Sequence, residues 1–401
     1  MILPRQFAQI PRFRLLYSDP SPIHPLQALT TSLTANNQAP RASIYAKRED
    51  HSSPLACAGN KYRKLEYLIP DILNPAPPTP NSAVNGGATA PGKVTTLVTE
   101  GAVQSNHTIQ VASVAQRLGL ECVVVLHKGT GGGLGAAVDK EAFLRVGNVQ
   151  VANLLGAEVR VLEPSPPQGK KTNPVIDILD ALGADSKVPY WIPSGASLHP
   201  LGGLGYARAA FEIAAQEERA SQNDDLGGSG RYDYIFVACG SGSTVGGLIA
   251  GFNLLEKSLK SQTHPPRKVI GILNSPTMPC SYHEERVLRF ARMAGGMIGL
   301  DPESDITMDD VCLDDRFTGA AYGVLDPESK QYLNMMAQKE GVILDPVYTA
   351  KVIRGLVHWV QNGDLQRDWA QRATAAQSEQ ANALFIHTGG QSALPAYADI
   401  D

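Results

Sequence analysis

The sequence has no apolar run that approaches the roughly 18 residues needed to cross a bilayer. Its N-terminal segment, residues 1–15, mixes arginine and glutamine with apolar residues, so it lacks the continuous apolar core of a secretory signal. We therefore expect no membrane association, and the cytoplasm is the default location.

The sequence also has few cysteines and a small net charge. The five cysteines are scattered and form no CxxC pair, so the sequence implies neither a disulfide framework nor a zinc site. We expect reduced, mostly buried thiols and no bound metal. The net charge is −4 and no basic block is present, so the sequence lacks the basic patch that nucleic-acid binding requires.

What the sequence does contain is the composition of a globular protein, with 43% hydrophobic and 18% charged residues. Short apolar segments typical of buried strands alternate with helical patterns, which predicts an α/β fold with a mainly parallel sheet. The predicted strands are residues 95–99, 122–126, 159–162, 234–238 and 269–273. The predicted helices are residues 107–118, 149–155 and 248–255, and loops are expected at 74–93, 129–135 and 221–231.

In parallel sheets, ligands bind beyond the carboxyl ends of the strands, which directs attention to the segments after Thr99 and Ala238. The second segment, Cys239–Gly247, reads CGSGSTVGG and lies between a predicted strand and a predicted helix. Glycines let the backbone approach an anion, and a helix N-terminus supplies free N–H groups. The segment lacks the lysine of a P-loop and the spacing of a dinucleotide fingerprint.

This segment therefore predicts a site for a single phosphate group, although a tight strand-to-helix turn without a ligand is the alternative. The residues expected to bind the phosphate are Gly240, Ser241, Gly242, Ser243 and Thr244.

Four further segments carry a family resemblance. They are residues 46–71 (AKREDHSSPLACAGNKYRKLEYLIPD), 99–111 (TEGAVQSNHTIQV), 340–351 (EGVILDPVYTAK) and 387–391 (HTGGQ). Together they resemble the 1-aminocyclopropane-1-carboxylate (ACC) deaminase and D-cysteine desulfhydrase family. That family belongs to the fold type II pyridoxal 5′-phosphate (PLP) enzymes, which include the tryptophan synthase β-subunit.

The resemblance runs from about residue 10 to the C-terminus. It implies a two-domain α/β fold with parallel-sheet domains and PLP in the cleft between them. Residues 65–190 would form a small domain, and residues 1–64 and 191–401 a large one. The family also suggests a homodimer.

The resemblance implies that Lys61, in Gly59-Asn60-Lys61, is the Schiff-base lysine that binds PLP. Such a lysine suits the chemistry, because a lowered pKa lets it act first as a nucleophile and then as a base. The alternative is a solvated basic helix face formed by Lys61, Arg63 and Lys64. Within the resemblance, Lys64 matches a residue near the phosphate.

Ser105 and Asn106 match a Gln-Ser-Asn loop of the family. The resemblance implies that Asn106 binds the PLP 3′-oxygen. Ser105 would contact the substrate carboxylate, transfer a proton or act as a nucleophile. Ser105 also suits the N-cap of the following helix, and both roles can hold together. The role of the neighbouring His107 is left open.

Tyr322 and Tyr348 match two active-site tyrosines of the family. Their hydroxyls would orient the substrate amine and help to move protons. Ordinary buried tyrosines with one satisfied hydroxyl are the alternative. The role of His387 is left open.

Thr349 and Thr388 depart from the ACC deaminase pattern, which has glutamate and leucine at these places, and they resemble the small hydroxyl residues of D-cysteine desulfhydrases. The resemblance places them at the pyridine nitrogen of PLP. A carboxylate there would keep the nitrogen protonated, whereas a threonine hydroxyl gives a weaker electron sink. That sink suffices to eliminate a thiolate, but opening a cyclopropane should be harder.

These observations predict a PLP-dependent lyase or deaminase that converts a small amino acid into a 2-oxo acid and ammonia. ACC deaminase-like and D-cysteine desulfhydrase-like activities both stay open, as does another elimination or substitution at Cα, Cβ or Cγ. A PLP-binding protein without turnover is the alternative from another class. The joint presence of Ser105, Tyr322 and Tyr348 argues against it.

Overall fold

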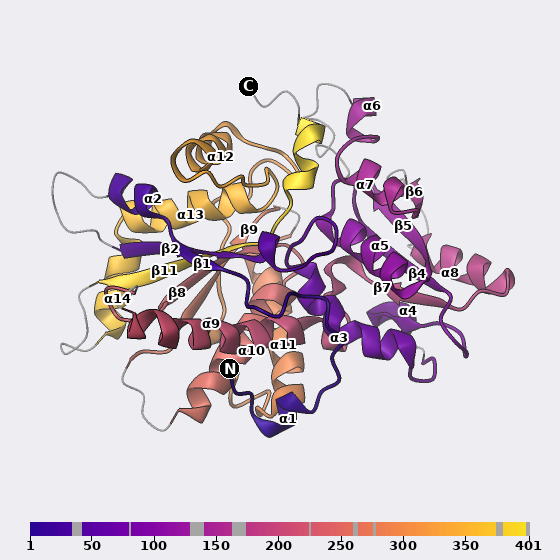
Figure 1. The fold of residues 1–401 in the computed structure, drawn as a ribbon, viewed down its shortest axis with the longest axis horizontal. Coiled ribbons are helices and arrows are strands. Elements are labelled where there is room, and N and C mark those ends of the chain that lie inside the picture. The colour runs from indigo at the N-terminus through magenta and orange to yellow at the C-terminus, as the bar shows by residue number, and fades with distance from the viewer. Residues whose placement is uncertain are drawn as a thin grey trace.

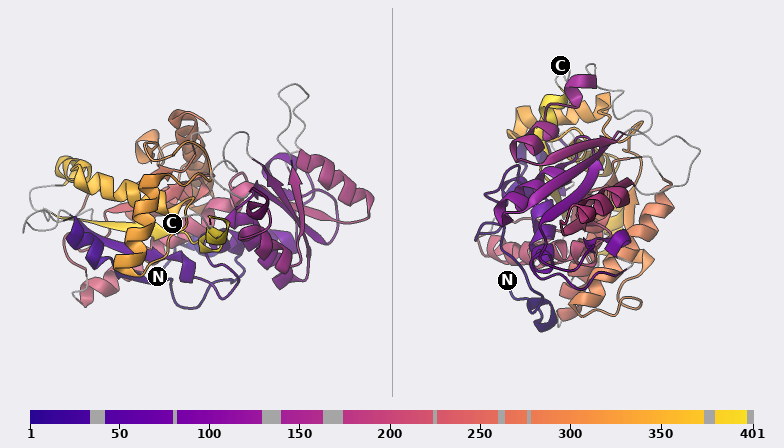
Figure 2. Two further views of the ribbon diagram at one scale, coloured as in Figure 1. Left: turned by 90° about the horizontal axis from the view of Figure 1, so that it is seen from above. Right: turned by 90° about the vertical axis from the view of Figure 1, so that its right-hand side faces the viewer.

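The computed structural model describes residues 1–33, 42–79, 82–128, 140–162, 174–223, 226–259, 264–275, 278–373 and 380–397. This part of the chain forms a six-stranded and a five-stranded β-sheet, which lie in the left and right halves of Figure 1. The left panel of Figure 2 shows the same division from above. The predicted α/β class is confirmed.

The six-stranded sheet has the order β1-β2-β11-β8-β9-β10 and is parallel except for the edge pair β1–β2. Its strands are β1 (Ile23–Pro25), β2 (Ala42–Arg48), β8 (Tyr234–Cys239), β9 (Lys268–Leu273), β10 (Cys312–Asp314) and β11 (Ala381–His387). Every residue of the central strand β11 is buried, as expected for a parallel strand that is covered on both faces.

Alternate residues of β8 enter two different hydrophobic cores. Ile235 and Val237 pack with α9, α10 and α11, whereas Tyr234 and Phe236 pack with α2, α12, α13 and α14. The first group comprises α9 (Leu204–Gln222), α10 (Ser243–Ser258) and α11 (Cys280–Ile298). The second comprises α2 (Gln27–Ser32), α12 (Pro327–Glu340), α13 (Thr349–Gln361) and α14 (Asp364–Arg372).

The five-stranded sheet has the order β3-β7-β4-β5-β6, and only the pair β3–β7 is antiparallel. Its strands are β3 (Gly87–Ala88), β4 (Thr96–Ala102), β5 (Glu121–His127), β6 (Glu158–Leu162) and β7 (Pro189–Ile192). One face packs on α3 (Lys61–Leu73), α5 (Asn106–Leu118) and α7 (Asn148–Leu154), and the other on α8 (Pro174–Ala184). Short helices complete the described chain: α1 (Arg5–Ala8), α4 (Ser82–Asn85) and α6 (Lys140–Phe143).

The structure corrects three of the predicted boundaries. Strand β4 continues to Ala102, so part of the expected loop after Thr99 is strand. Helix α10 begins at Ser243 rather than at residue 248, and its glycines pack closely against α11 and α9. The expected loop at residues 74–93 contains α4 and β3. The expected loop at 129–135 lies outside the described residues, as do residues 224–225 of the loop at 221–231.

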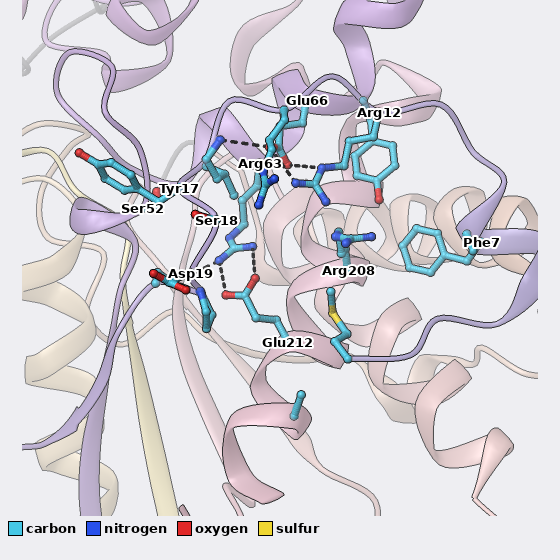
Figure 3. A pocket seen from close by; sticks show the side chains of 18 of the residues that line it. Phe7, Arg12, Tyr17, Ser18, Asp19, Ser52, Arg63, Glu66, Arg208 and Glu212 are labelled. Carbon is cyan, nitrogen blue, oxygen red and sulfur yellow. Dashed lines mark hydrogen bonds and ion pairs between the residues drawn. The ribbon is translucent and has the colours of Figure 1, made fainter. Parts of the chain in front are cut away.

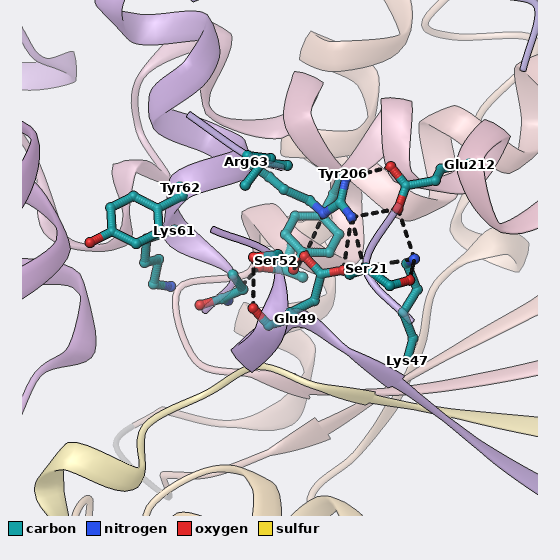
Figure 4. Close-up of polar contacts among 12 residues, drawn as sticks. Ser21, Lys47, Glu49, Ser52, Lys61, Tyr62, Arg63, Tyr206 and Glu212 are labelled. Carbon is teal, nitrogen blue, oxygen red and sulfur yellow. Dashed lines mark hydrogen bonds and ion pairs between the residues drawn. The ribbon is translucent and has the colours of Figure 1, made fainter. Parts of the chain in front are cut away.

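A buried ion network holds α3 between the two halves of the molecule (Figure 4). The guanidinium of Arg63 pairs with the carboxylates of Glu49 and Glu212, and the Lys47 ammonium also pairs with Glu212 at 2.8 Å. Arg63 lies two residues after Lys61 on α3, while Glu49 follows β2 and Glu212 belongs to α9. The network therefore fixes the start of α3 relative to the six-stranded sheet.

All five cysteines are free, with Cys122 and Cys239 buried and the other three half-buried. The thiols are thus less buried than the sequence analysis expected. No helix in the described part of the chain is both long and apolar enough to cross a membrane.

Candidate active site

A cavity of about 690 Å³ lies where the N-terminal segment passes over α3 and α9 (Figure 3). It contains none of the predicted site residues. The charges on its wall are already compensated in part: Arg12 pairs with Glu66, and Arg63 pairs with Glu212. Volume alone therefore does not mark this cavity as the active site.

The second cavity, about 370 Å³ in volume, lies beyond the carboxyl ends of β4, β8, β9 and β11. This size is typical of small-molecule sites, and the position is the one expected for a parallel α/β fold. It brings together most of the predicted site residues: Lys61, Ser105, Asn106, Gly240, Ser241, Gly242, Thr244, Tyr322, Tyr348 and Thr388. Three predicted residues, Lys64, Ser243 and Thr349, are buried beside or behind its wall and do not line it.

The glycine-rich segment leads from β8 into α10 along this wall. Gly242 precedes the helix with a φ of +92°, and a Cβ there would come within 3.3 Å of Val287 and Phe290. Only glycine adopts this conformation easily in so small a space. The turn therefore presents the first N–H groups of α10 to the cavity, as a phosphate site requires.

Lys64 reinforces this assignment. Its Nζ is fully buried and donates hydrogen bonds to Ser243 Oγ at 2.8 Å and to the Gly195 carbonyl at 3.2 Å. Burial, together with the nearby Lys61, lowers the pKa of Lys64 well below its usual value. Within the described chain no carboxylate pairs with this ammonium, so a phosphate group at the loop would supply the missing negative charge. The residues present therefore fit a phosphate-bearing cofactor.

Lys61 is the first residue of α3 and lines the cavity. Its backbone N–H donates to Gln110 Oε1, and the side chain of the preceding Asn60 donates to Thr244 Oγ1. These bonds tie the start of α3 to both walls of the site. Burial lowers the pKa of Lys61 to about 8, so a substantial fraction of its amine is neutral near physiological pH.

Ser105 caps α5, since its Oγ accepts a hydrogen bond from the His107 backbone N–H at 3.3 Å. The N-cap interpretation is therefore confirmed, and the serine also lines the cavity. The Oδ1 of Asn106 accepts from Asn148 Nδ2 at 2.8 Å, which fixes the orientation of its amide. Burial lowers the pKa of His107 well below its usual value, with Lys61 and Lys64 adding to the shift, so the ring is neutral.

The hydroxyls of Tyr322 and Tyr348 contact each other on the wall of the cavity. Burial raises the pKa of Tyr322 to about 12 and that of Tyr348 still further. Both phenols are therefore protonated at neutral pH and can donate a hydrogen bond. The joint placement agrees with the predicted use of two tyrosines in one site.

The two threonines have different surroundings. Thr388 lines the cavity, whereas Thr349 is fully buried and its Oγ1 donates to Asp345 Oδ1 at 2.7 Å. The same carboxylate accepts hydrogen bonds from the backbone N–H groups of Val347, Tyr348 and Thr349, where the chain enters α13. Burial raises the pKa of Asp345, although these hydrogen bonds oppose the shift. The hydroxyl of Thr349 is thus already engaged, and its contact with a pyridine nitrogen stays a prediction.

Sequence reasoning missed several lining residues, among them Asn274, Ser275, His283 and Arg286. Asn274 and Ser275 directly follow β9, so the rule that directed attention to the end of β8 would also have found them. His283 and Arg286 lie on α11, a helix that the sequence analysis did not predict. The other open histidine, His387, is fully buried, contacts Asp50 and the Ile343 carbonyl, and does not line the cavity.

The fold and this site agree with the comparisons with known proteins. Residues 16–389 match the family model described as "Pyridoxal-phosphate dependent enzyme". The chain belongs to this family of PLP-dependent enzymes, and its cofactor is PLP.

Within the family, the chain is similar to 1-aminocyclopropane-1-carboxylate deaminases. It is 35% identical to that of Burkholderia multivorans over 392 residues, or 98% of each chain. It is also 35% identical to that of Ralstonia nicotianae over 388 residues, or 97% of this chain and 96% of the relative. A solved ACC deaminase homologue superimposes with a TM-score of 0.72 at 28% identity, covering 98% of this chain and 96% of that structure. The Escherichia coli diaminopropionate ammonia lyase shares the fold, with a TM-score of 0.55 at 16% identity. The chain is therefore an ACC deaminase-like PLP enzyme of the lyase and deaminase type.

Proposed function

We propose that this enzyme eliminates a good leaving group from the β-carbon of a small amino acid and releases a 2-oxo acid and ammonia. D-cysteine and β-substituted alanines are the substrates that fit best. One observation carries the proposal: the residues that line the cavity, all in the described chain, include no aspartate or glutamate. PLP bound here would lack an adjacent carboxylate on its ring nitrogen and would withdraw electrons only moderately.

Lys61 would hold PLP and then move the proton at the substrate Cα. Its amine lies at the start of α3, where burial keeps part of it neutral and able to accept a proton. The glycine-rich segment and Lys64 would bind the phosphate. PLP supplies the electron withdrawal that makes the Cα proton removable.

Ser105 and the N-terminus of α5 would bind the substrate α-carboxylate. The hydroxyl and the free N–H groups of the helix end suit an anion, and Asn106, at the same helix end, would contact the cofactor ring. Because this carboxylate site is separate from Lys61, the Cα–H bond of the substrate can be directed at the lysine amine. The Ser105–Asn106 pair thus orients the substrate, while Lys61 moves the proton.

Tyr322 and Tyr348 would act on the leaving group. Both phenols are protonated at neutral pH, because burial raises their pKa values. Their contact lets one hydroxyl donate to the departing group while the other supports it. Thr388, on the wall of the same cavity, would face the ring nitrogen. Thr349 would support that region through Asp345.

The choice of substrate is tested by ammonia release from ACC, D-cysteine, L-cysteine and β-chloro-alanine under identical conditions. We expect β-elimination from D-cysteine or β-chloro-alanine to be faster than ring opening of ACC, because only the former have an easy leaving group. Equal or faster turnover of ACC would contradict the argument from the missing carboxylate. A Thr388→Ser variant keeps the hydroxyl on the cavity wall, so it serves as the matched control and should show the same order of substrates.

ACC deamination is the second candidate, and the 35% identity to several ACC deaminases favours it. Ring opening would then have to proceed with the hydroxyls of Thr388 and the two tyrosines in place of a carboxylate. Absence of ammonia from all four substrates, with PLP bound, would instead favour a PLP-binding protein without turnover. The predicted homodimer, the cytoplasmic location and the domain boundary near residues 64 and 190 stay proposals.

Binding of PLP to the cofactor-free protein is expected to accelerate as pH rises. Only the neutral Lys61 amine attacks the aldehyde, and with a pKa of about 8 about one-tenth of it is neutral at pH 7. The rate constant for the growth of visible absorbance should therefore rise roughly tenfold from pH 7 to its plateau above pH 9. A rate that is constant over this range would show that Lys61 is not the reacting amine.

A further inference from the structure

Helix α11 contributes two side chains to the active-site cavity that the proposed function does not use. His283 and Arg286 are three residues apart, so they lie on the same face of the helix. His283 is 6% exposed, and Arg286 is half-buried. The next turn of α11 places Val287 and Phe290 against Gly242, which brings this face beside the glycine-rich segment.

Arg286 has no acidic partner within the described chain. Its guanidinium lies over the ring of Phe290, 5.5 Å from the centroid. Burial lowers its pKa below the usual value, which reflects the cost of a charge that is partly removed from water. Because the cavity wall contains no carboxylate, a negatively charged ligand would have to balance this guanidinium.

Three other residues that line this cavity carry buried polar atoms without partners. Nδ2 and Oδ1 of Asn274, Oγ of Ser275 and Nε2 of His283 are buried without a hydrogen bond in the described chain. Asn274 is only 1% exposed, and all three residues line the same cavity. Buried polar atoms are normally hydrogen-bonded, so three unsatisfied side chains in one cavity indicate a surface shaped for a polar ligand.

We propose that His283 and Arg286, together with Asn274 and Ser275, form an oxyanion subsite in the active-site cavity. This inference rests on the proposed function, because it takes PLP to occupy the same cavity. Two acidic groups could bind there: the outer edge of the PLP phosphate, or a second acidic group at the far end of the amino-acid substrate. Arginine pairs well with both, since its planar fork matches carboxylate and phosphate oxygens.

The surroundings favour the distal acid of the substrate. The PLP phosphate would already be bound by the N-terminus of α10, the hydroxyls of Ser241 and Thr244, and Lys64 behind Ser243. The substrate α-carboxylate would be bound by Ser105 and the N-terminus of α5. Arg286 thus remains for a third anionic group, which a β-substituted alanine with an acidic substituent would provide.

The test compares Arg286→Met with Arg289→Met on purified holoenzyme. Arg289 is the matched control, because it also lies over Phe290, at 5.3 Å, but is exposed and does not line the cavity. Dissociation constants for both enantiomers of aspartate and alanine are measured from the change in cofactor absorbance. We expect Arg286→Met to weaken aspartate binding about tenfold or more, as for a lost charge-assisted hydrogen bond, and to change alanine binding by less than about twofold.

A second measurement decides between the two anions. PLP and pyridoxal, which lacks the phosphate, are titrated into the cofactor-free variants. If Arg286→Met weakens PLP about tenfold and leaves pyridoxal unchanged, the subsite binds the cofactor phosphate. The relevant quantities are two ratios of dissociation constants, aspartate to alanine and PLP to pyridoxal. If Arg286→Met changes neither ratio, or if Arg289→Met changes both ratios equally, the subsite does not exist.

These readouts do not depend on turnover, so they stay informative even if no ammonia is released and the proposed function fails. Should Arg286→Met be unstable, Arg286→Lys keeps the positive charge but loses the planar fork and is expected to retain part of the preference. His283→Ala, measured in the same way, should weaken the same ligand without affecting alanine or pyridoxal. If both variants fully kept the wild-type preference for aspartate over alanine and for PLP over pyridoxal, the proposed subsite would also be wrong.

Discussion

Lys61→Ala is expected to purify without the visible absorbance of bound PLP and to lose about a thousandfold or more of the wild-type activity. The side chain at the start of α3 is the amine that lines the cavity, and its removal takes away both the covalent link to PLP and the base. Absorbance spectra of the purified variant, before and after incubation with excess PLP, measure the first effect. Ammonia release measures the second.

The chain offers a matched control for this variant. Lys351 is also fully buried, and burial lowers its pKa to about 8 as well. However, its Nζ donates to the carbonyls of Asn274 and Thr318, and it does not line the cavity. Lys351→Met should therefore keep the PLP absorbance. If Lys61→Ala kept the colour and Lys351→Met lost it, the assignment of Lys61 would be wrong.

Arg63→Met is expected to lower the free energy of unfolding by about 3–5 kcal/mol, because removing one partner of a buried network leaves its carboxylates uncompensated. Arg63 is the shared partner of Glu49 and Glu212, and its side chain is almost completely buried. Burial raises the pKa of Glu212, but Arg63 and Lys47 more than offset this and hold it below its usual value. Denaturant unfolding followed by fluorescence measures the loss.

A second substitution distinguishes lost charge balance from lost packing. In the variant that combines Arg63→Met with Glu212→Gln, one stranded carboxylate is removed, while Lys47 stays close to Glu49. We expect this double variant to recover part of the stability. Equal or greater destabilisation would show that the packing of the Arg63 side chain, rather than its charge, stabilises the start of α3.

The sequence by itself determined the α/β class, and it predicted the phosphate segment and the cofactor lysine. Strand β8 is apolar along its length because both of its faces are covered, and this pattern is visible in sequence, whereas β11, which contains Asn382 and His387, was not predicted. The segment Cys239–Gly247 could be interpreted locally, because close approach of the backbone to an anion requires glycine at fixed positions. Resemblance of ordered motifs then implied PLP and Lys61.

Only the tertiary structure decided which polar side chains share one cavity. Asn274, His283 and Arg286 come from β9 and α11, and no local pattern shows that these elements close the site beside the glycine-rich segment. Likewise, the sequence analysis gave Thr349 and Thr388 the same role. In the fold, the Thr349 hydroxyl points to Asp345, whereas Thr388 lines the wall of the active-site cavity. The physical reason is that local sequence determines backbone conformation and burial. The direction and partner of a buried hydroxyl or guanidinium depend on which distant elements pack around it.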